Sequence, residues 1–133
     1  MYTAYSSIRR VLTEDSAVSS QVSSSDIRVG YSLTLESYPC VTIQKIGGGT
    51  YGLLGFGTSP AGSKNRWEDR LFQIDIFSQV SIEELELIAD NVMKALISGC
   101  SGARMLSDAG GYDDGYQAWR SIQTWSMWDL VQD

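Results

Sequence analysis

The sequence predicts an α+β fold in which a mostly antiparallel β-sheet packs against two helices. Apolar residues recur at helical spacing in two segments, near the N-terminus and after residue 81. Segments rich in β-branched and aromatic residues lie between and after them, separated by turn-forming residues. The resulting order is helix, short strand, strand, long glycine-rich loop, strand, helix, strand. This order favours a sheet with the helices against one face.

Length and composition are those of one globular domain over residues 1–133. A chain of this size buries enough surface for a core without metal or disulfide staples. No run of eighteen apolar residues occurs, so we expect no membrane-spanning helix, and the N-terminal charge order is wrong for a secretory signal. Ten basic and sixteen acidic residues give a formal charge of −6, which argues against nucleic-acid binding. An acidic surface could still face DNA that passes without adhering.

The N-terminal half begins with a predicted helix at 3–14, with Thr3 as its cap and one apolar face. That face consists of Tyr5, Ile8, Val11 and Leu12. The serine-rich stretch 15–26 predicts a short tucked turn, and 27–31 a short strand. A strand is expected at 40–46 from its β-branched content, although neither of its faces is cleanly apolar.

The segment 66–79 is the clearest predicted strand, because Phe72, Ile74 and Ile76 alternate with Gln73, Asp75 and Phe77. The helix that follows is the most strongly predicted element. Ser81 and Glu84 form an S-x-x-E capping box, and Gly99 stops the helix. Its apolar stripe consists of Leu85, Ile88, Val92 and Leu96.

The C-terminal part predicts a short strand at 103–106, a turn at 107–115 and a last strand at 116–130. In the last strand Trp119, Trp125 and Met127 share one face, and Ile122 and Trp128 share the other. One face could pack on the helices and the other on a second subunit. Alternatively, protein covers the strand on both sides. We take Trp119, Trp125 and Met127 as candidate interface residues.

The sequence contains few residues of the types that catalyse reactions. The absence of histidine removes the common triads and most zinc sites. Cys40 and Cys100 are isolated in sequence and are interpreted as buried free thiols rather than as a disulfide or a nucleophile. We expect no enzyme activity, no cofactor and no metal.

The glycine-rich stretch 47–65 contains one G-x-G-x-x-G match, Gly47 to Gly52. A dinucleotide site needs these glycines between a strand and a helix, whereas here glycine and proline continue the loop toward another strand. Gly57 and Gly62 have P-loop spacing, but Ser63-Lys64 reverses the required order. We therefore interpret the match as chance.

Adjacent carboxylates are a second weak signal for chemistry. Glu68-Asp69, Asp113-Asp114 and the glutamates after Ser81 are neighbours in sequence, which does not place two acids across a cleft. A solvated turn and a charged helix start explain them better.

The same glycine-rich loop carries apolar side chains that predict a contact. Tyr51, Leu53, Leu54 and Phe56 would form an apolar patch on a glycine background, and such patches usually mark binding surfaces. The alternative is that these four residues continue a hairpin into the core.

Taken in order, these elements resemble the siphophage tail-terminator family, also called tail-completion or tail-to-head joining proteins. The resemblance covers nearly the whole chain through apolar patterns rather than catalytic signatures. Its segments are "DSAVSSQV", "IRVG", "YPCVTI", "FQIDIFS", "EELELIADNVMKALIS" and "YDDGYQAWRSIQTWSMW". The length and glycine content of the 47–65 loop depart from the pattern.

The resemblance implies a virion protein that assembles in the host cytoplasm into a homo-oligomeric ring, usually a hexamer. Such a ring ends the major tail tube protein's polymerisation, contacts a head–tail connector or stopper protein, and lets DNA pass without specific binding. The family has no catalytic residues. Two alternatives remain open at this point: another neck, head-completion or minor tail component, and a small nucleotide-binding domain.

Overall fold

The computed structural model describes residues 4–30, 37–49, 65–100 and 102–132, with side chains described over 7–30, 37–46, 70–100 and 102–127. The helical elements are α1 (Ala4–Glu14), α2 (Ser16–Ser19), the 3-10 helix η1 (Ser24–Asp26) and α3 (Ile82–Gly99). The strands are β1 (Ile27–Val29), β2 (Cys40–Gly49), β3 (Asn65–Ser78), β4 (Arg104–Asp113) and β5 (Ala118–Gln132).

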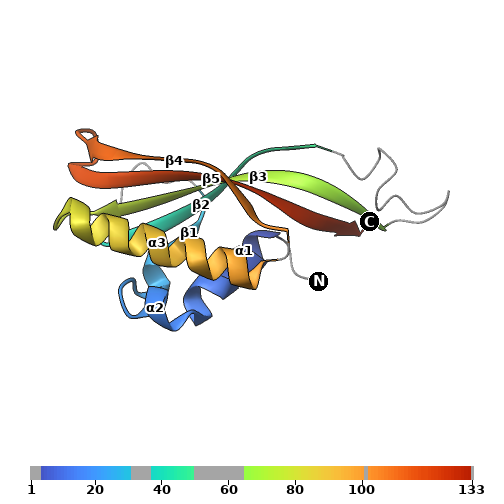
Figure 1. Cartoon of the computed structure of the whole chain (residues 1–133), viewed down its shortest axis with the longest axis horizontal. Helices are drawn as coiled ribbons and strands as arrows, with labels where there is room; N and C mark the ends of the chain where they lie inside the picture. The colour runs from blue at the N-terminus through green and yellow to red at the C-terminus, as the bar shows by residue number, and fades with distance from the viewer. Residues whose placement is uncertain (1–3, 31–36, 50–64, 101, 133) are drawn as a thin grey trace.

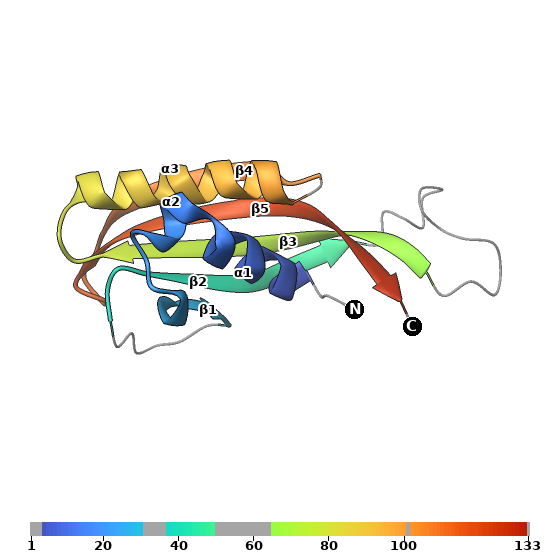
Figure 2. The same cartoon turned by 90° about the horizontal axis from the view of Figure 1, so that it is seen from below.

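The described strands form one five-stranded sheet in the order β1-β2-β3-β5-β4. Only β1 and β2 pair in parallel, and the other three pairings are antiparallel. Helices α1 and α3 lie on the same face of this sheet (Figures 1 and 2). The predicted α+β class, with a mostly antiparallel sheet and helices on one face, is confirmed.

The core lies between α3 and the central strands because both present an apolar face of matching period. The predicted stripe of α3 is fully inside, with Leu85, Ile88, Val92 and Leu96 each at most 2% exposed. The alternating residues of β3 face this stripe, and β5 adds Trp125, the largest fully buried side chain among the described residues. The strand residues of this cluster are Val41, Ile43, Phe72, Ile74, Ile76, Trp125 and Met127.

Helix α1 packs closely against α3, and together they form the helical layer on this face of the sheet. Ile8 and Leu12 of α1 are buried, as the predicted apolar face requires. A Cβ atom on Gly99 would lie 2.6 Å from Val11 Cγ1, a distance that real contacts do not reach. The glycine predicted to stop the helix thus also makes room for a neighbouring helix.

Side-chain caps fix the helix starts. The Asp15 carboxylate accepts hydrogen bonds from the amides of Ala17 and Val18, which begins α2 within the serine-rich segment. Ser81 Oγ accepts from the Glu84 amide at 3.1 Å, as the capping box predicts. The Glu84 carboxylate, however, accepts from Ser78 Oγ at 2.9 Å, so it anchors the end of β3.

Two predicted boundaries are wrong. The loop expected at 47–65 is shorter, because Gly47–Gly49 belong to β2 and pair with Leu71–Asp69, while Asn65 belongs to β3. Residues 50–64, including the four apolar residues predicted to make a contact, lie outside the described residues. The turn expected at 107–115 is also mostly strand, because β4 continues to Asp113. An edge strand exposed to solvent tolerates the serine, aspartate and glycine that otherwise signal a turn.

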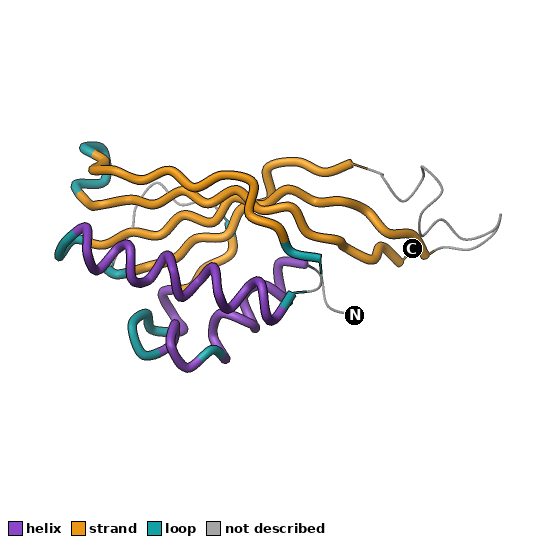
Figure 3. Tube along the Cα trace, viewed as in Figure 1, coloured by secondary structure: helices purple, strands orange, loops and turns teal. Residues whose placement is uncertain are grey.

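The sheet is longer than its helical cover. The C-terminal part of β2, the N-terminal part of β3 and the C-terminal part of β5 continue together past the ends of α1 and α3 (Figures 1 and 3). Backbone pairing persists along this extension, with Gly49 opposite Asp69 and Asp69 opposite Trp128. The extension therefore presents both faces without a helix from the described residues.

Two β-bulges interrupt the sheet at the same level. One lies in β2 between Lys45 and Gly47, and the other in β4 between Met105 and Ser107. Each bulge leaves one extra apolar residue, Ile46 or Leu106, which is 45% or 51% exposed. Between the bulges the paired row runs through Lys45, Phe72, Trp125 and Met105.

We predict that Trp125→Ala destabilises the isolated subunit by about 3–5 kcal/mol, because it empties a fully buried aromatic site. Urea unfolding followed by circular dichroism measures the loss. The control is Val80→Ala, a truncation at a side chain that is 74% exposed and should change stability little. A loss from Trp125→Ala no larger than that of the control would contradict the packing described here.

Candidate functional site: two sheet edges and a charged cluster

The residues predicted as an interface fall into two groups. Tyr51, Leu53, Leu54 and Phe56 lie outside the described residues, so their contact stays a prediction. Trp119, Trp125 and Met127 share one face of β5, as expected, and this face packs on the helices. Trp125 is 0% and Met127 3% exposed, so the subunit's own core already encloses both. Trp119 is partly buried beside that core.

A buried hydrogen-bonded chain explains why Trp125 belongs to the core. Its indole Nε1 donates to Gln123 Oε1 at 3.0 Å, and Gln123 Nε2 donates to the Ala89 carbonyl at 3.0 Å. Gln123 is 1% exposed. The indole nitrogen of Trp125 and both amide atoms of Gln123 therefore have hydrogen-bond partners although they lie away from water. These hydrogen bonds link β5 to α3.

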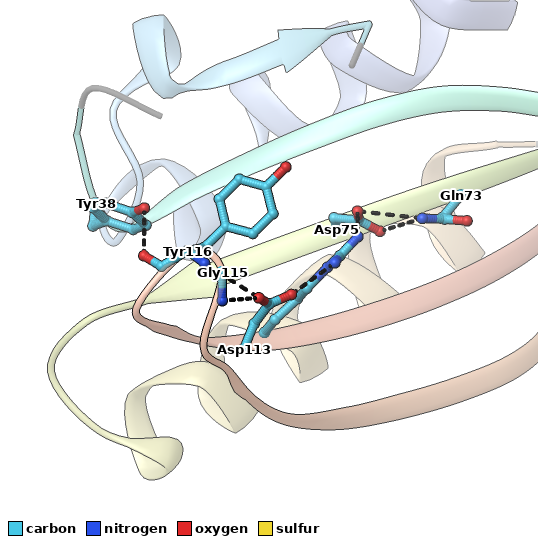
Figure 4. Close-up of polar contacts among 7 residues, drawn as sticks. Tyr38, Gln73, Asp75, Asp113, Gly115 and Tyr116 are labelled. Carbon is cyan, nitrogen blue, oxygen red and sulfur yellow. Dashed lines mark hydrogen bonds and ion pairs between the residues drawn. The ribbon is translucent and has the colours of Figure 1, made fainter. Parts of the chain in front are cut away.

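The opposite face of the sheet carries a charged cluster centred on Arg120 of β5. Arg120 Nη2 donates to Asp75 Oδ2 at 2.6 Å, and Nη1 donates to Asp113 Oδ2 at 2.9 Å. The amide of Gln73 donates to Asp75 as well, and Figure 4 shows these contacts side by side. Because Asp75 is only 3% exposed, its charge depends on these partners.

Asp113 ties the cluster to the turn that joins β4 and β5. Its Oδ1 accepts from the amides of Gly115 and Tyr116, at 2.9 and 3.2 Å (Figure 4). The hydrogen bond from Arg120 is the largest effect on the pKa of Asp113 and lowers it; burial, the next largest, opposes it, and the two amides each lower the pKa further. The acidic pair predicted as a solvated turn thus includes one carboxylate that organises the turn.

Aromatic rings enclose the guanidinium of Arg120. Its Cζ lies 5.4 Å from the ring centroid of Phe77 and 5.6 Å from that of Tyr116. Tyr116 in turn accepts a hydrogen bond at its carbonyl from the Tyr38 hydroxyl, at 3.3 Å. The cluster joins β3, β5 and the segment before β2. Its geometry is that of a structural centre, in which one guanidinium bonds two carboxylates.

The two cysteines are free, as predicted. Cys40 is buried, and this burial raises the pKa of its thiol to about 12. Cys100 is half-buried, and burial raises its thiol pKa too. The thiolate is the nucleophilic form of cysteine, so neither site favours nucleophilic chemistry near neutral pH.

The described part of the chain contains no group of three or more metal-ligating side chains of the histidine, cysteine or carboxylate type. Among the helices described, none has the length and apolar content needed to cross a bilayer.

One edge of the sheet carries an acidic groove between α3 and β4. The groove encloses about 360 Å³ and has Leu85, Ala89 and Met93 in its wall. Its carboxylates are Glu86 and Asp90 from α3 and Asp108 from β4. Ile82, Ile97, Leu106 and Tyr112, all exposed, lie on the two elements that form it. We call this surface the α3–β4 groove.

The other edge of the sheet is basic. It is formed by β1 and, beyond the three residues of β1, by the outer side of β2. Its exposed apolar side chains are Val29 and Ile46, both 45% exposed. Its cations are Arg9, which donates to the Ile27 carbonyl, together with Arg28 and Lys45. We call this surface the β1–β2 edge.

Sequence reasoning missed both edges for an identifiable reason. Ile46 and Leu106 become exposed because each is the extra residue of a bulge, and a bulge reverses the alternation of faces after it. The only available signal was the failure of 40–46 to show a clean apolar face. Which strands lie at the edges depends on the strand order, which is a property of the whole sheet.

No protein-family model matches this chain, and no curated protein matches it in sequence. Among solved structures, the fold is similar to that of a chain in the virion of a native gene transfer agent (GTA) particle. The two superpose with a TM-score of 0.72 over 96% of this chain and 95% of that chain, at 10% sequence identity. At this identity the likeness establishes the shared fold.

We predict that Asp113→Asn weakens the pH dependence of folding stability. The pKa of Asp113 is lowered in the folded state, so the stability that it contributes is present above its unfolded pKa of about 3.9. That stability is lost as the pH falls from about 5 through the lower folded pKa. Urea unfolding between pH 7 and 3 should show a shallower decline for the variant than for the wild type.

The matched control for this experiment is Asp114→Asn, which removes a carboxylate from the same turn without touching the pair between Asp113 and Arg120. If Asp113→Asn and Asp114→Asn changed the decline equally, the ion pair would not be its source.

Proposed function

We propose that this protein is a structural component of a phage-type virion, and specifically the ring that ends the tail tube at its head-proximal end and joins tail to head. The observation that carries the proposal is the fold shared over 96% of the chain with a chain of the gene transfer agent virion. The resemblance of the ordered sequence elements to tail terminators supports the narrower role.

Two physical features agree with a ring around a DNA channel. A closed ring needs two different contact surfaces on each subunit, and the two edges of this sheet differ in charge and shape. Six subunits of charge −6 would carry a formal charge of −36, which would let DNA pass without adhesion.

The charged cluster and the thiols support a non-enzymatic role. Arg120 occupies both carboxylates of the cluster in ion pairs, and burial keeps the Cys40 thiol protonated. The glycine motif also lacks the setting of a phosphate site, because Gly47–Gly49 lie within β2 and pair with β3. A small nucleotide-binding domain therefore has no support from the described residues.

We predict that particles made without this protein have uncapped, overlong tails or tails that are separate from filled heads. Electron microscopy of lysates from a strain lacking the gene measures tail length and attachment, and expression of the intact gene in trans is the control. Gold-labelled antibody should mark the junction of head and tail. Normal attached tails, with the label elsewhere on the particle, would instead indicate another neck, head-completion or minor tail component.

We further predict that replacing residues 50–64 by a short glycine–serine linker leaves the subunit folded but impairs joining. This segment contains Tyr51, Leu53, Leu54 and Phe56, the apolar residues expected to meet a partner. Thermal unfolding tests the fold, and the yield of joined particles tests the function. The control keeps the length of 50–64 and changes only these four residues to serine. It separates the effect of losing the apolar contacts from the effect of shortening the segment. Full joining by both variants would make the segment a connector only.

A further inference from the structure

We infer that the α3–β4 groove of one copy binds the β1–β2 edge of a second copy of this chain. This inference rests on the proposed ring and names the surfaces that close it. It differs from the interface expected on β5, because Trp125 and Met127 of that set are buried within one subunit.

Charge is the first argument for this pairing. The α3–β4 groove carries the carboxylates of Glu86, Asp90 and Asp108, and Lys94 pairs with Asp90 at 2.9 Å, which leaves a formal charge of −2. On the opposite edge, η1, β1, β2 and Arg9 together carry three basic side chains and one acidic one, a formal charge of +2. The two edges of one sheet are thus complementary in charge, which guides both the approach and the orientation of a partner.

On each surface a charged residue lies on the helical side of the sheet, whereas Arg28, opposite Thr42, lies on the other side. Asp108 pairs with Gln123 and Lys45 with Phe72, and both partners face the helical layer. Val29 lies opposite buried Ile43 on that side too. The acidic groove of one copy can therefore contact the basic edge of the next. In that arrangement the helical layers of the two copies lie side by side.

Open backbone groups supply a third argument. β1 and β4 are the outermost described strands, and β2 extends beyond its pairing with β1. β4 runs antiparallel to β2 within the sheet, because each of the three intervening pairings reverses direction. A neighbour that continues the sheet would meet β4 with an antiparallel strand, the arrangement in which edge strands readily pair.

The same charges exclude the symmetrical alternative. Two copies that met through their α3–β4 grooves would bring Glu86 and Asp108 against their equivalents, with Asp90 already paired to Lys94, and like charges at an interface are unfavourable. The groove therefore selects a different surface of the next copy. Contacts between unlike surfaces repeat head to tail, which is the arrangement of a ring.

The experiment is a charge swap measured by sedimentation velocity at low salt over a wide range of protein concentration. We expect the wild type to associate, and Glu86→Lys/Asp108→Lys to weaken association by about tenfold or more. Arg28→Glu/Lys45→Glu should weaken it similarly, because it reverses the other surface. Mixing the two variants should restore association between them, since each then supplies one reversed and one native surface. High salt should reduce all of these differences.

The matched control is Glu14→Lys/Glu83→Lys, which changes the charge by the same amount at two exposed positions outside the groove. Circular dichroism verifies that each variant is folded. A wild type that stays monomeric, a groove variant no weaker than the control, or no recovery on mixing would each overturn the inference. So would a groove variant that loses binding to tail tubes while self-association is unchanged, because the groove would then belong to another protein.

Failure of this inference is distinguishable from failure of the proposed function. If the wild type associates and the swaps have no effect, the ring stands and a different surface closes it. If the swaps behave as expected but antibody marks another part of the particle, the interface stands and the tail-terminator role fails.

Discussion

The structure depends on how Trp125 is held between the sheet and α3. Its ring fills the core at the level where β2 and β4 are both bulged, and its indole is linked through Gln123 to a backbone carbonyl of α3. The course of the strands, the position of α3 and the packing of the core are therefore coupled at this level of the sheet. The acidic groove reaches this point through Gln123, which lines it and bonds Trp125, and the basic edge reaches it through Lys45, which lies in the same paired row as Trp125.

Most elements could be predicted from local signals, because their stabilising contacts are periodic in sequence. The stripe from Leu85 to Leu96 and the alternation around Ile74 gave the helix and the strand that form the core. Predictions were wrong where a residue type has two uses. Glycine and aspartate after residue 106 signal a turn, yet they also suit an exposed edge strand, and only pairing with β5 distinguishes the two. The sequence also left two alternatives for the face of Trp125, packing on the helices or on a second subunit. Strand spacing shows which residues share a face, but it does not show what covers that face.

The candidate surfaces were less predictable than the fold. Charge complementarity between edges depends on the strand order, which brings residues 9, 28 and 45 to one side of the sheet and residues 86, 90 and 108 to the other. Similarly, the ion pairs of Arg120 join residues 75, 113 and 120 through pairings that no local pattern indicates. The sequence showed an excess of acid, and the fold determines where that excess lies.

The bulge at Leu106 has a further consequence for how this chain tolerates changes in length. Before the bulge, Met105 faces the helices, and after it Asp108 does, so one extra residue resets the alternation of β4. Deleting Leu106 would place Met105 and Asp108 two residues apart, so a regular ladder with β5 would keep both on the helical face and Asp108 in the groove. The bulge can therefore absorb the loss of one residue, whereas the same deletion at a regular position of the strand would turn every later side chain to the opposite face.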